Sequence, residues 1–535
     1  MFYRTMSIQG ARRLFGRIAA RPILSAAVVG VLAFALNAVI SLAVRMPEPT
    51  ITDEFSYLLA ADTFAHGRLT NPTHPCWEHF ESVHINQIPT YASKYPPAQG
   101  MMLSLGQVVF GRPIVGVWIS AGLACAALTW MLAGWLPRRW ALTGGLIALV
   151  HPLLVTWGQN YWGGLVALTG GSLVLGALRR IAHEPLASYS GVLGIGLAIL
   201  ANSRPFEGAL LSLPVAAALC LGLYRRRASL GAMGILRTVL PAACILSLVA
   251  SWMLYYNWRV TGEPFTMPYQ LHERQYGGAS LFLFLPPKPI PVYRHKAIED
   301  IQVDFALNEY ERQRTPQGLA LGVYRRFTSD LTNKYIVNGN SLASMLIFCA
   351  VAFLLIGERN RWIRFAILTL LVFTCGLLTA TYTWAHYSTP AACLLLLLFL
   401  QALRRLGTWG SPGRRGGRTI ARAFVILAIA FFASLTWLTV SSWTKSSFAY
   451  RRAEILAELK QSDEKDLVIV RYSPNHNYHQ EWVYNEADID GAPVVWAREM
   501  DENRMARLID YFRDRRIWLL EADKESPRPV PYPAG

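Results

Sequence analysis

Charged residues are scarce in this sequence, which argues against a soluble globular protein. Only 16% of the 535 residues are Asp, Glu, Lys or Arg, whereas 53% are hydrophobic. The hydrophobic residues form runs long enough to cross the hydrocarbon layer of a bilayer, which is about 30 Å thick. The sequence therefore predicts a polytopic α-helical membrane protein.

Cysteine is also rare, and its placement excludes a disulfide framework. Six of the seven cysteines lie inside apolar runs, which leaves Cys76 alone in a segment between runs. No internal repeat of fixed period is present.

Acidic residues are almost absent from every second loop between the apolar runs. Residues 1–21 carry five arginines and no acid, and the later loops on the same side contain only Glu184 and Glu358. This positive-inside pattern accounts for the formal charge of +17 and places the N-terminus in the cytoplasm. The positive charge therefore implies no nucleic-acid partner.

The apolar runs predict about eleven transmembrane helices. The first run is too long for a signal-peptide core and lacks a cleavage site, so it is interpreted as a retained anchor. The expected spans are 22–44, 114–136, 140–157, 161–178, 190–201, 206–223, 235–256, 341–356, 362–381, 388–403 and 420–443.

The chain is expected to have three parts. A cytoplasmic N-terminus (1–21) precedes a transmembrane domain (22–443) with long external loops at 46–111 and 257–340. The tail 444–535 contains short apolar runs typical of strands at 467–472, 493–497 and 517–520, and helical spacing at 501–515. It is expected to form a small external α/β domain that ends in a disordered, Pro-rich segment from Ser526.

The first external loop carries the pattern most suggestive of chemistry. Asp53 and Glu54 follow the first span directly and begin a helix-like run, which places a carboxylate at the headgroup boundary. A carboxylate there is suited to take the proton of an acceptor hydroxyl during transfer from a polyprenyl phosphate. Acids at a helix N-terminus also stabilise its dipole, and spacing alone does not separate the two roles.

A resemblance favours the catalytic role. The Asp53-Glu54 pair, the long first loop, the Lys94-Tyr95-Pro96-Pro97 motif before an apolar helix, and the polytopic body resemble the GT-C superfamily. Within it the chain is most similar to bacterial relatives of the protein O-mannosyltransferases and the lipid A aminoarabinose transferases. The resemblance implies that Asp53 is the catalytic base, with Glu54 as its neighbour or alternate.

Candidate substrate-binding residues lie at the external ends of other spans. Arg204, near Glu207, interrupts an apolar hairpin and is suited to grip the leaving phosphate. Lys94 and Arg259 are further cationic candidates, although both suit a solvated surface. The remaining candidates are Tyr95, Asn160, His386 and Tyr387, of which the aromatic residues also fit an interfacial belt.

A metal site is a weaker hypothesis. His74, His79 and His84 lie close in sequence and imidazole binds divalent cations, but the spacing matches no closed motif. Loop packing is the favoured explanation of these histidines. A divalent cation is therefore a possible cofactor, and no other cofactor is indicated.

The sequence does not decide the roles of two polar segments. The segment 264–289, rich in aromatic residues, Gly and Pro, suits either a mobile lid or a passive cover. The segment 475–482 follows an expected strand end, where either an acceptor contact or a plain polar loop fits.

The sequence thus predicts a multi-pass glycosyltransferase of a bacterial inner membrane, with its C-terminus in the periplasm. The expected partners are a polyprenyl-phosphate-sugar donor and a lipid, glycan or protein acceptor, and direct displacement by the acceptor would invert the anomeric centre. A secondary transporter and a non-catalytic envelope assembly protein remain alternatives. The expected spans carry almost no charge in their centres, which is unlike a transporter.

Overall fold

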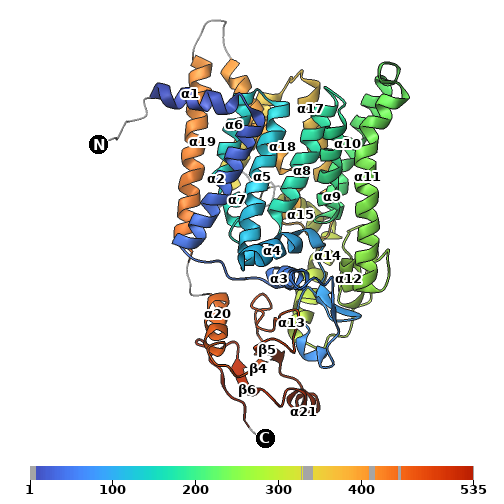
Figure 1. Cartoon of the computed structure of the whole chain (residues 1–535), viewed down its shortest axis with the longest axis vertical. Coiled ribbons are helices and arrows are strands. Elements are labelled where there is room, and N and C mark those ends of the chain that lie inside the picture. Colours follow the sequence, from blue (N-terminus) through green and yellow to red (C-terminus); the bar gives the residue numbers. More distant parts are fainter. Residues whose placement is uncertain (1–7, 327, 329–340, 409–415, 444–446, 534–535) are drawn as a thin grey trace.

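The computed structural model describes residues 8–326, 328, 341–408, 416–443 and 447–533. A bundle of roughly parallel helices forms one end of the molecule, and a small sheet near the C-terminus forms the other (Figure 1). Parts of the expected segments 1–21, 257–340 and 444–535 lie outside the described residues.

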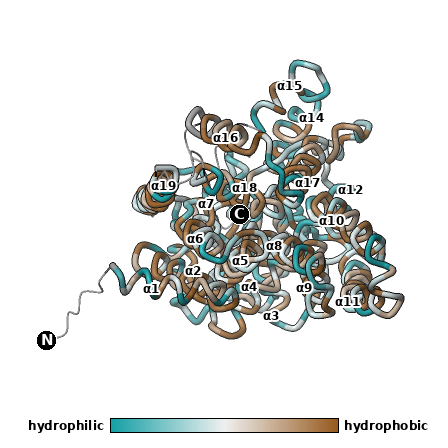
Figure 2. The backbone as a smooth tube through the Cα atoms, turned by 90° about the horizontal axis from the view of Figure 1, so that it is seen from above, coloured by the Kyte–Doolittle hydropathy of each residue, from teal (hydrophilic) through white to brown (hydrophobic). Residues whose placement is uncertain are grey.

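The bundle is built from helices that coincide with the apolar runs. The described chain contains seven helices long and apolar enough to cross a membrane. They are α2 (Pro22–Ala43), α5 (Pro113–Trp135), α8 (Gly164–Ile181), α10 (Pro205–Arg225), α11 (Arg227–Thr261), α18 (Thr389–Thr408) with the turn before it, and α19 (Gly416–Ser441). Hydrophobic residues make up much of the backbone of these helices, as the brown colouring in Figure 2 shows. The protein is therefore a predominantly helical membrane protein.

The remaining expected spans are shorter helices. These are α9 (Ala187–Ala201), α16 (Ser341–Leu355) and α17 (Arg361–Leu377). The expected span 140–157 is instead two helices, α6 (Arg138–Leu149) and α7 (Pro152–Trp157). The break falls at His151 because the residue before a proline is disfavoured in the helical region. The count of eleven spans stays a prediction.

Small residues allow the central helices to approach closely. A Cβ atom on Gly30 of α2 would lie 2.9 Å from the carbonyl oxygen of Gly122 in α5. A Cβ on Gly171 of α8 would meet the Pro390 carbonyl of α18 at 1.9 Å. Close backbone contact is a usual means of helix association in lipid, where burial of apolar surface provides no driving force.

Three short helices lie across the two ends of the bundle. The Arg-bearing helix α1 (Ile8–Ala19) crosses the end distant from the C-terminal sheet, and α3 (Thr52–Ala65) and α4 (Pro97–Phe110) cross the other (Figure 1). Between α3 and α4, the turn η1 (Trp77–Phe80) and strands β1 (Asn71–Pro72), β2 (Ile85–Asn86) and β3 (Thr90–Ser93) complete the first loop. This loop places Asp53 and Lys94 at the same end of the bundle.

The second loop covers the same end with short helices. They are α12 (Pro268–Gln275), α13 (Lys296–Glu299), the π-helical turn η2 (Asp300–Leu307), α14 (Asn308–Gln313) and α15 (Pro316–Arg325). The bridge between Phe282 and Ala380 joins this loop to the segment after α17.

The C-terminal segment forms a four-stranded sheet in the order β5-β4-β6-β7. Strands β4 (Asp466–Arg471), β5 (Val494–Arg498) and β6 (Arg516–Glu521) are parallel and occupy the three expected strand segments. Helix α20 (Phe448–Leu459) precedes the sheet, and α21 (Glu502–Tyr511) lies within the stretch expected to be helical.

The end of the chain differs from expectation. Residues from Ser526 onward were predicted to be disordered, but Val530–Pro531 pair antiparallel with β6 as strand β7. A proline is tolerated there because β7 is an edge strand, where one side of the backbone needs no partner.

The C-terminal segment packs directly on the first loop. The Tyr91 hydroxyl donates to the Asn485 carbonyl at 2.9 Å, and the Ala487 amide donates to Asp62 Oδ2 at 2.7 Å. Arg498 Nε donates to the Glu81 carbonyl at 2.8 Å. These contacts connect the sheet to the same loop that carries Asp53.

The segment between α2 and α3 contains Glu48, an acid whose pKa is raised in the folded protein. Burial raises the pKa of Glu48 to about 7, with Arg452 lowering it and Glu54 raising it. Because the folded state binds this proton more tightly than the unfolded state, stability should fall as pH rises from about 4.5 to about 7. The loss is as much as about 3 kcal/mol.

The stability prediction concerns Glu48→Gln. Thermal unfolding of the detergent-solubilised protein should shift to lower temperature between pH 5 and pH 8 in the wild type, and the shift should be much smaller in Glu48→Gln. The exposed Glu454 is a matched control, since its side chain is 60% accessible, so Glu454→Gln should retain the wild-type shift. An equal shift in wild type and Glu48→Gln would contradict this account.

Candidate active site

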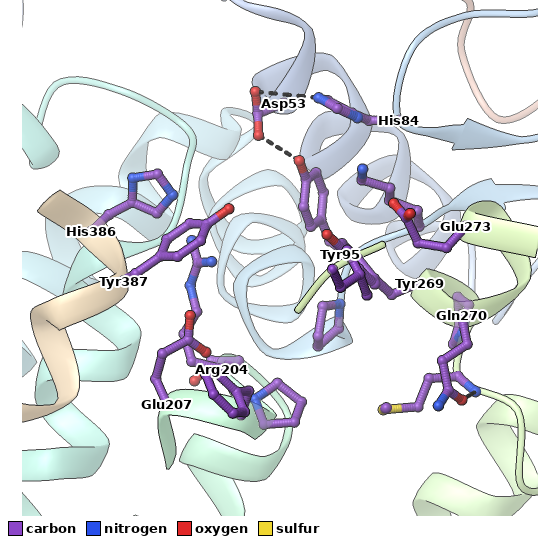
Figure 3. A pocket seen from close by; sticks show the side chains of 18 of the residues that line it. Asp53, His84, Tyr95, Arg204, Glu207, Tyr269, Gln270, Glu273, His386 and Tyr387 are labelled. Carbon is purple, nitrogen blue, oxygen red and sulfur yellow. Dashed lines mark hydrogen bonds and ion pairs between the residues drawn. The ribbon is translucent and has the colours of Figure 1, made fainter. Parts of the chain in front are cut away.

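A cavity of about 540 Å³ lies at the end of the bundle nearer the C-terminal sheet, where α3, the start of α10, α12 and the start of α18 meet. Seven of the ten expected catalytic or substrate-binding residues line it: Asp53, Lys94, Tyr95, Arg204, Glu207, His386 and Tyr387. These residues come from four separate parts of the chain. Figure 3 shows the labelled side chains arranged around the open centre.

Asp53 reaches the cavity from the first turn of α3, with its side chain 25% exposed. The Tyr95 hydroxyl donates a short hydrogen bond to Asp53 Oδ1, and His84 Nε2 lies 3.7 Å from Oδ2 (Figure 3). Burial, reinforced by the charge of Asp53, raises the pKa of Tyr95 well above 10, so Tyr95 remains a neutral donor. Asp53 is therefore oriented through one oxygen, and its other oxygen faces His84.

His84 is held in a conformation rare for its residue type. Its φ of 69° lies in the left-handed region, which costs energy for a residue with a Cβ. Its carbonyl oxygen accepts from Ser56 Oγ at 2.7 Å and from the backbone amide of Lys94 at 3.2 Å. Burial, with Lys94 and His479 nearby, lowers the pKa of His84 well below 6.5. A neutral His84 therefore adjoins Asp53.

Glu54 does not line the cavity, although it was expected to be the neighbour or alternate of the base. It is buried on the other face of α3, where it accepts from the Thr50 amide at 2.7 Å, the Thr50 hydroxyl at 3.0 Å and the Tyr161 amide at 2.8 Å. Successive helical residues point about 100° apart, because an α-helix has 3.6 residues per turn. Glu54 therefore fixes α3 to its surroundings.

Two cations line the cavity. Lys94 Nζ lies 4.8 Å from the ring centroid of Tyr269, and the Arg204 guanidinium lies 4.6 Å from that of Tyr387. Within the described residues neither cation has a carboxylate within ion-pair distance, although Glu207 interacts with Arg204 at longer range. Burial lowers the pKa of Lys94, while Glu273 and Asp53 raise it. Both cations are available to an anionic ligand.

Two other expected binding residues lie away from the cavity. The Asn160 amide donates to the Thr156 carbonyl of its own turn at 3.1 Å. Arg259 is exposed and donates to the Tyr255 hydroxyl at 3.1 Å. The cavity lining includes neither side chain.

The three histidines considered for a metal are separated. His74 lies 3.1 Å from Asp490 Oδ1, and the ring of His79 faces the carbonyl oxygens of Arg498 and Arg504. Only His84 reaches the cavity. Among the residues that the structure describes, no group of three or more His, Cys, Asp or Glu side chains is arranged to hold a metal ion. The fold separates these histidines because His74 and His79 pack against the C-terminal segment.

Several lining residues were missed by sequence reasoning. The ring of Tyr57 stacks on Tyr95 with centroids 4.5 Å apart, and its position four residues after Asp53 on one helix face was a usable signal. Tyr269, Gln270 and Glu273 of α12 line the opposite wall (Figure 3), and no local pattern distinguished them. His479, from the polar segment 475–482, also lines the cavity.

Comparison with solved structures identifies a protein of similar fold. No protein-family model and no curated protein matches the sequence. ArnT from Cupriavidus metallidurans in the apo state is similar in structure, with a TM-score of 0.51 and 14% identity over 91% of this chain and 88% of that one.

Two further solved structures align less closely. The Archaeoglobus fulgidus oligosaccharyltransferase tethered with an acceptor peptide has a TM-score of 0.49 and 12% identity, over 92% of this chain and 68% of that one. Cupriavidus metallidurans ArnT bound to undecaprenyl phosphate has a TM-score of 0.43 and 13% identity, over 96% and 90%. The likeness to apo ArnT shows that the protein shares the fold of that solved structure.

Proposed function

We propose that the protein is a glycosyltransferase that moves a sugar from a polyprenyl-phosphate donor to an acceptor hydroxyl. The observation that carries the proposal is one cavity with an oriented carboxylate, Asp53, and two cations without ion-pair partners in the described chain, Lys94 and Arg204. A base and cationic phosphate ligands are the groups that such a transfer requires. The GT-C fold agrees with this function.

In the proposed reaction the acceptor oxygen attacks the anomeric carbon as the bond from that carbon to the phosphate oxygen breaks. Asp53 takes the proton of the acceptor hydroxyl through Oδ2, because Tyr95 already occupies Oδ1. His84 Nε2 lies 3.7 Å from Oδ2 on the other side of the carboxylate. The departing phosphate keeps the bonding electrons, and Lys94 and Arg204 stabilise its added negative charge. A single displacement of this kind inverts the anomeric centre.

The position of the cavity supports a site at the water boundary. Asp53 lies on a helix that crosses the end of the bundle, and Arg204 and Tyr387 lie at the starts of α10 and α18. A transporter more often places charged groups near the centre of its helices. With the positive-inside pattern, this end is the outer, periplasmic face of a bacterial inner membrane.

The test of the function is mass spectrometry of lipid-linked sugars and envelope glycans. A deletion strain should lack one sugar of defined mass on its acceptor and accumulate the lipid-linked donor. Wild-type protein should restore the sugar and Asp53→Asn should not. Identical profiles in the deletion strain and its parent would remove the proposal.

A pH prediction concerns Lys94. Because burial lowers its pKa below 10.5, the charge should be lost at lower pH than from an exposed lysine. The alkaline limb of kcat/KM, which reports the free enzyme, should therefore begin below pH 10.5 and move to higher pH in Lys94→Arg. The exposed Lys296→Arg is the control and should leave the profile unchanged. An identical limb in wild type and Lys94→Arg would show that another group sets it.

A further inference from the structure

A second, smaller cavity of about 240 Å³ lies in the region outside the bundle. Three aromatic side chains contribute to its wall, namely Trp77 of the first loop and Tyr276 and Tyr293 of the second. Rings of this kind present an apolar face for packing and a polar group at the edge. The cavity is about large enough for one small ring rather than an extended chain.

Polar groups of the same cavity are held in place. The Tyr276 hydroxyl donates to Glu81 Oε1 at 2.8 Å, and Arg294 donates to the same oxygen at 3.3 Å. The Glu81 side chain is only 2% exposed, and its Oε2 accepts no hydrogen bond in the described chain, with His295 Nε2 at 3.4 Å. Burial raises the pKa of Glu81. A buried carboxylate oxygen is therefore incompletely satisfied beside this cavity.

The donors and acceptors suit an uncharged, hydroxylated ligand. Arg294 is already paired with Glu78 at 3.4 Å and with Glu81, so it does not provide the unpaired cation that a phosphate requires. Gln275 Nε2 donates to the Ile88 carbonyl at 2.9 Å, which leaves Gln275 Oε1 as an acceptor. A sugar ring combines hydroxyl groups for such partners with a C–H face that packs on aromatic rings.

The two cavities share walls. Helix α12 contributes Tyr269, Gln270 and Glu273 to the large cavity and Gln275, with Tyr276 directly after it, to the small one. Ile301 lines the first cavity and Ile298 the second, and both pack in one cluster with Val83. The small cavity therefore adjoins the candidate active site at the side of the C-terminal segment, to which Glu81 and Glu78 are bonded.

We infer that the small cavity binds a sugar residue of the acceptor, so that the acceptor is a glycan whose reacting hydroxyl lies in the large cavity. The identification of this sugar as part of the acceptor rests on the proposed function. The binding of a sugar in the small cavity does not depend on Asp53. The sequence left lipid, glycan and protein acceptors open, and this inference favours a glycan.

Saturation-transfer NMR tests the binding directly. The probes are methyl glycosides of glucose, galactose, mannose, N-acetylglucosamine and arabinose, added to the full-length protein in detergent. At least one sugar should receive saturation from the wild type, and the signal should fall at least several-fold in Trp77→Leu. The matched control is Trp437→Leu, because Trp437 lies on α19 and is 70% exposed, and it should keep the wild-type signal.

A second variant guards against misfolding of Trp77→Leu. Val292 lines the small cavity and is 98% exposed, so Val292→Arg should block the cavity without disturbing a packed core. The inference is overturned if no probe receives saturation, or if Val292→Arg and Trp77→Leu both retain the wild-type signal.

The two proposals fail in distinguishable ways. Asp53→Asn should lose transfer and retain the sugar signal that depends on Trp77. With the identified acceptor, Val292→Arg should raise the acceptor KM several-fold and change kcat little. Retained transfer in Asp53→Asn would remove the assignment of the base and leave the sugar site intact. An unchanged acceptor KM in Val292→Arg would instead exclude the small cavity from acceptor binding.

Discussion

Asp53→Asn is expected to lower the rate of sugar transfer by about 10²–10⁴-fold, the contribution typical of a general base. The amide has the shape of the carboxylate, so its oxygen can still accept the Tyr95 hydroxyl, and the first turn of α3 should be retained. It cannot accept the acceptor proton. The measurement is the transfer rate of the purified variant with the donor and acceptor identified by mass spectrometry.

Glu54→Gln is the informative control for that experiment, because the two acids are adjacent in sequence and separated in role. Glu54 accepts hydrogen bonds from backbone and side chain in a buried position, and an amide nitrogen there would face donors. An unsatisfied buried donor costs about 1–3 kcal/mol. Glu54→Gln should therefore unfold at lower temperature and keep most of its activity per folded molecule. The assignment of the base is wrong if Asp53→Asn transfers sugar at the wild-type rate.

Arg204→Gln should have the second largest effect, a loss of about 10²–10³-fold in kcat/KM, comparable to the removal of one donor to a developing anion. The guanidinium lies against Tyr387 in the cavity and has no carboxylate partner in the described chain, so its charge is available to the leaving phosphate. Arg204→Lys should recover part of the loss, because it restores the charge without the planar pair of donors.

The control for Arg204 is Arg259, which the sequence had also suggested. Arg259 is exposed, lies outside the cavity and bonds only to a neighbouring tyrosine in the described structure. Arg259→Gln should therefore transfer sugar at close to the wild-type rate. Equal losses in the two variants would indicate a general effect of removing positive charge, and normal transfer in Arg204→Gln would exclude Arg204 from phosphate binding.

Both predictions also distinguish a glycosyltransferase from the two alternative functions, a scaffold protein and a transporter. If the protein were a scaffold in which Asp53 only stabilises the N-terminus of α3, Asp53→Asn would lower its stability. No glycosylated product would be formed by the wild type or the variant. A transporter would show a change in movement of substrate across the bilayer without a new glycosidic bond. Detection of the glycosylated product is therefore the measurement that decides between the classes.

Local sequence predicted the membrane helices and several of the residues that line the cavity. The apolar runs end at arginines, prolines or polar residues, and a helix that must satisfy its own backbone in lipid follows directly from such a run. Asp53, Arg204 and Tyr387, which line the cavity, were predicted because they lie near the ends of apolar runs, and Lys94 because its motif precedes an apolar helix. The membrane confines such ends to two surfaces, so residues distant in sequence were predictably brought to one side.

Only the tertiary structure decided which neighbours share the cavity. Asp53 faces the cavity and Glu54 is buried, because the direction of α3 relative to the bundle depends on its contacts with α4 and the C-terminal segment. His84 reaches Asp53 through a left-handed backbone turn, while His74 and His79 are held by partners more than 400 residues away. The wall from α12 depends on the same long-range packing. The membrane helices can be predicted from the hydropathy of consecutive residues. The positions of the side chains around the cavity depend on contacts between segments distant in sequence, which no local pattern reveals.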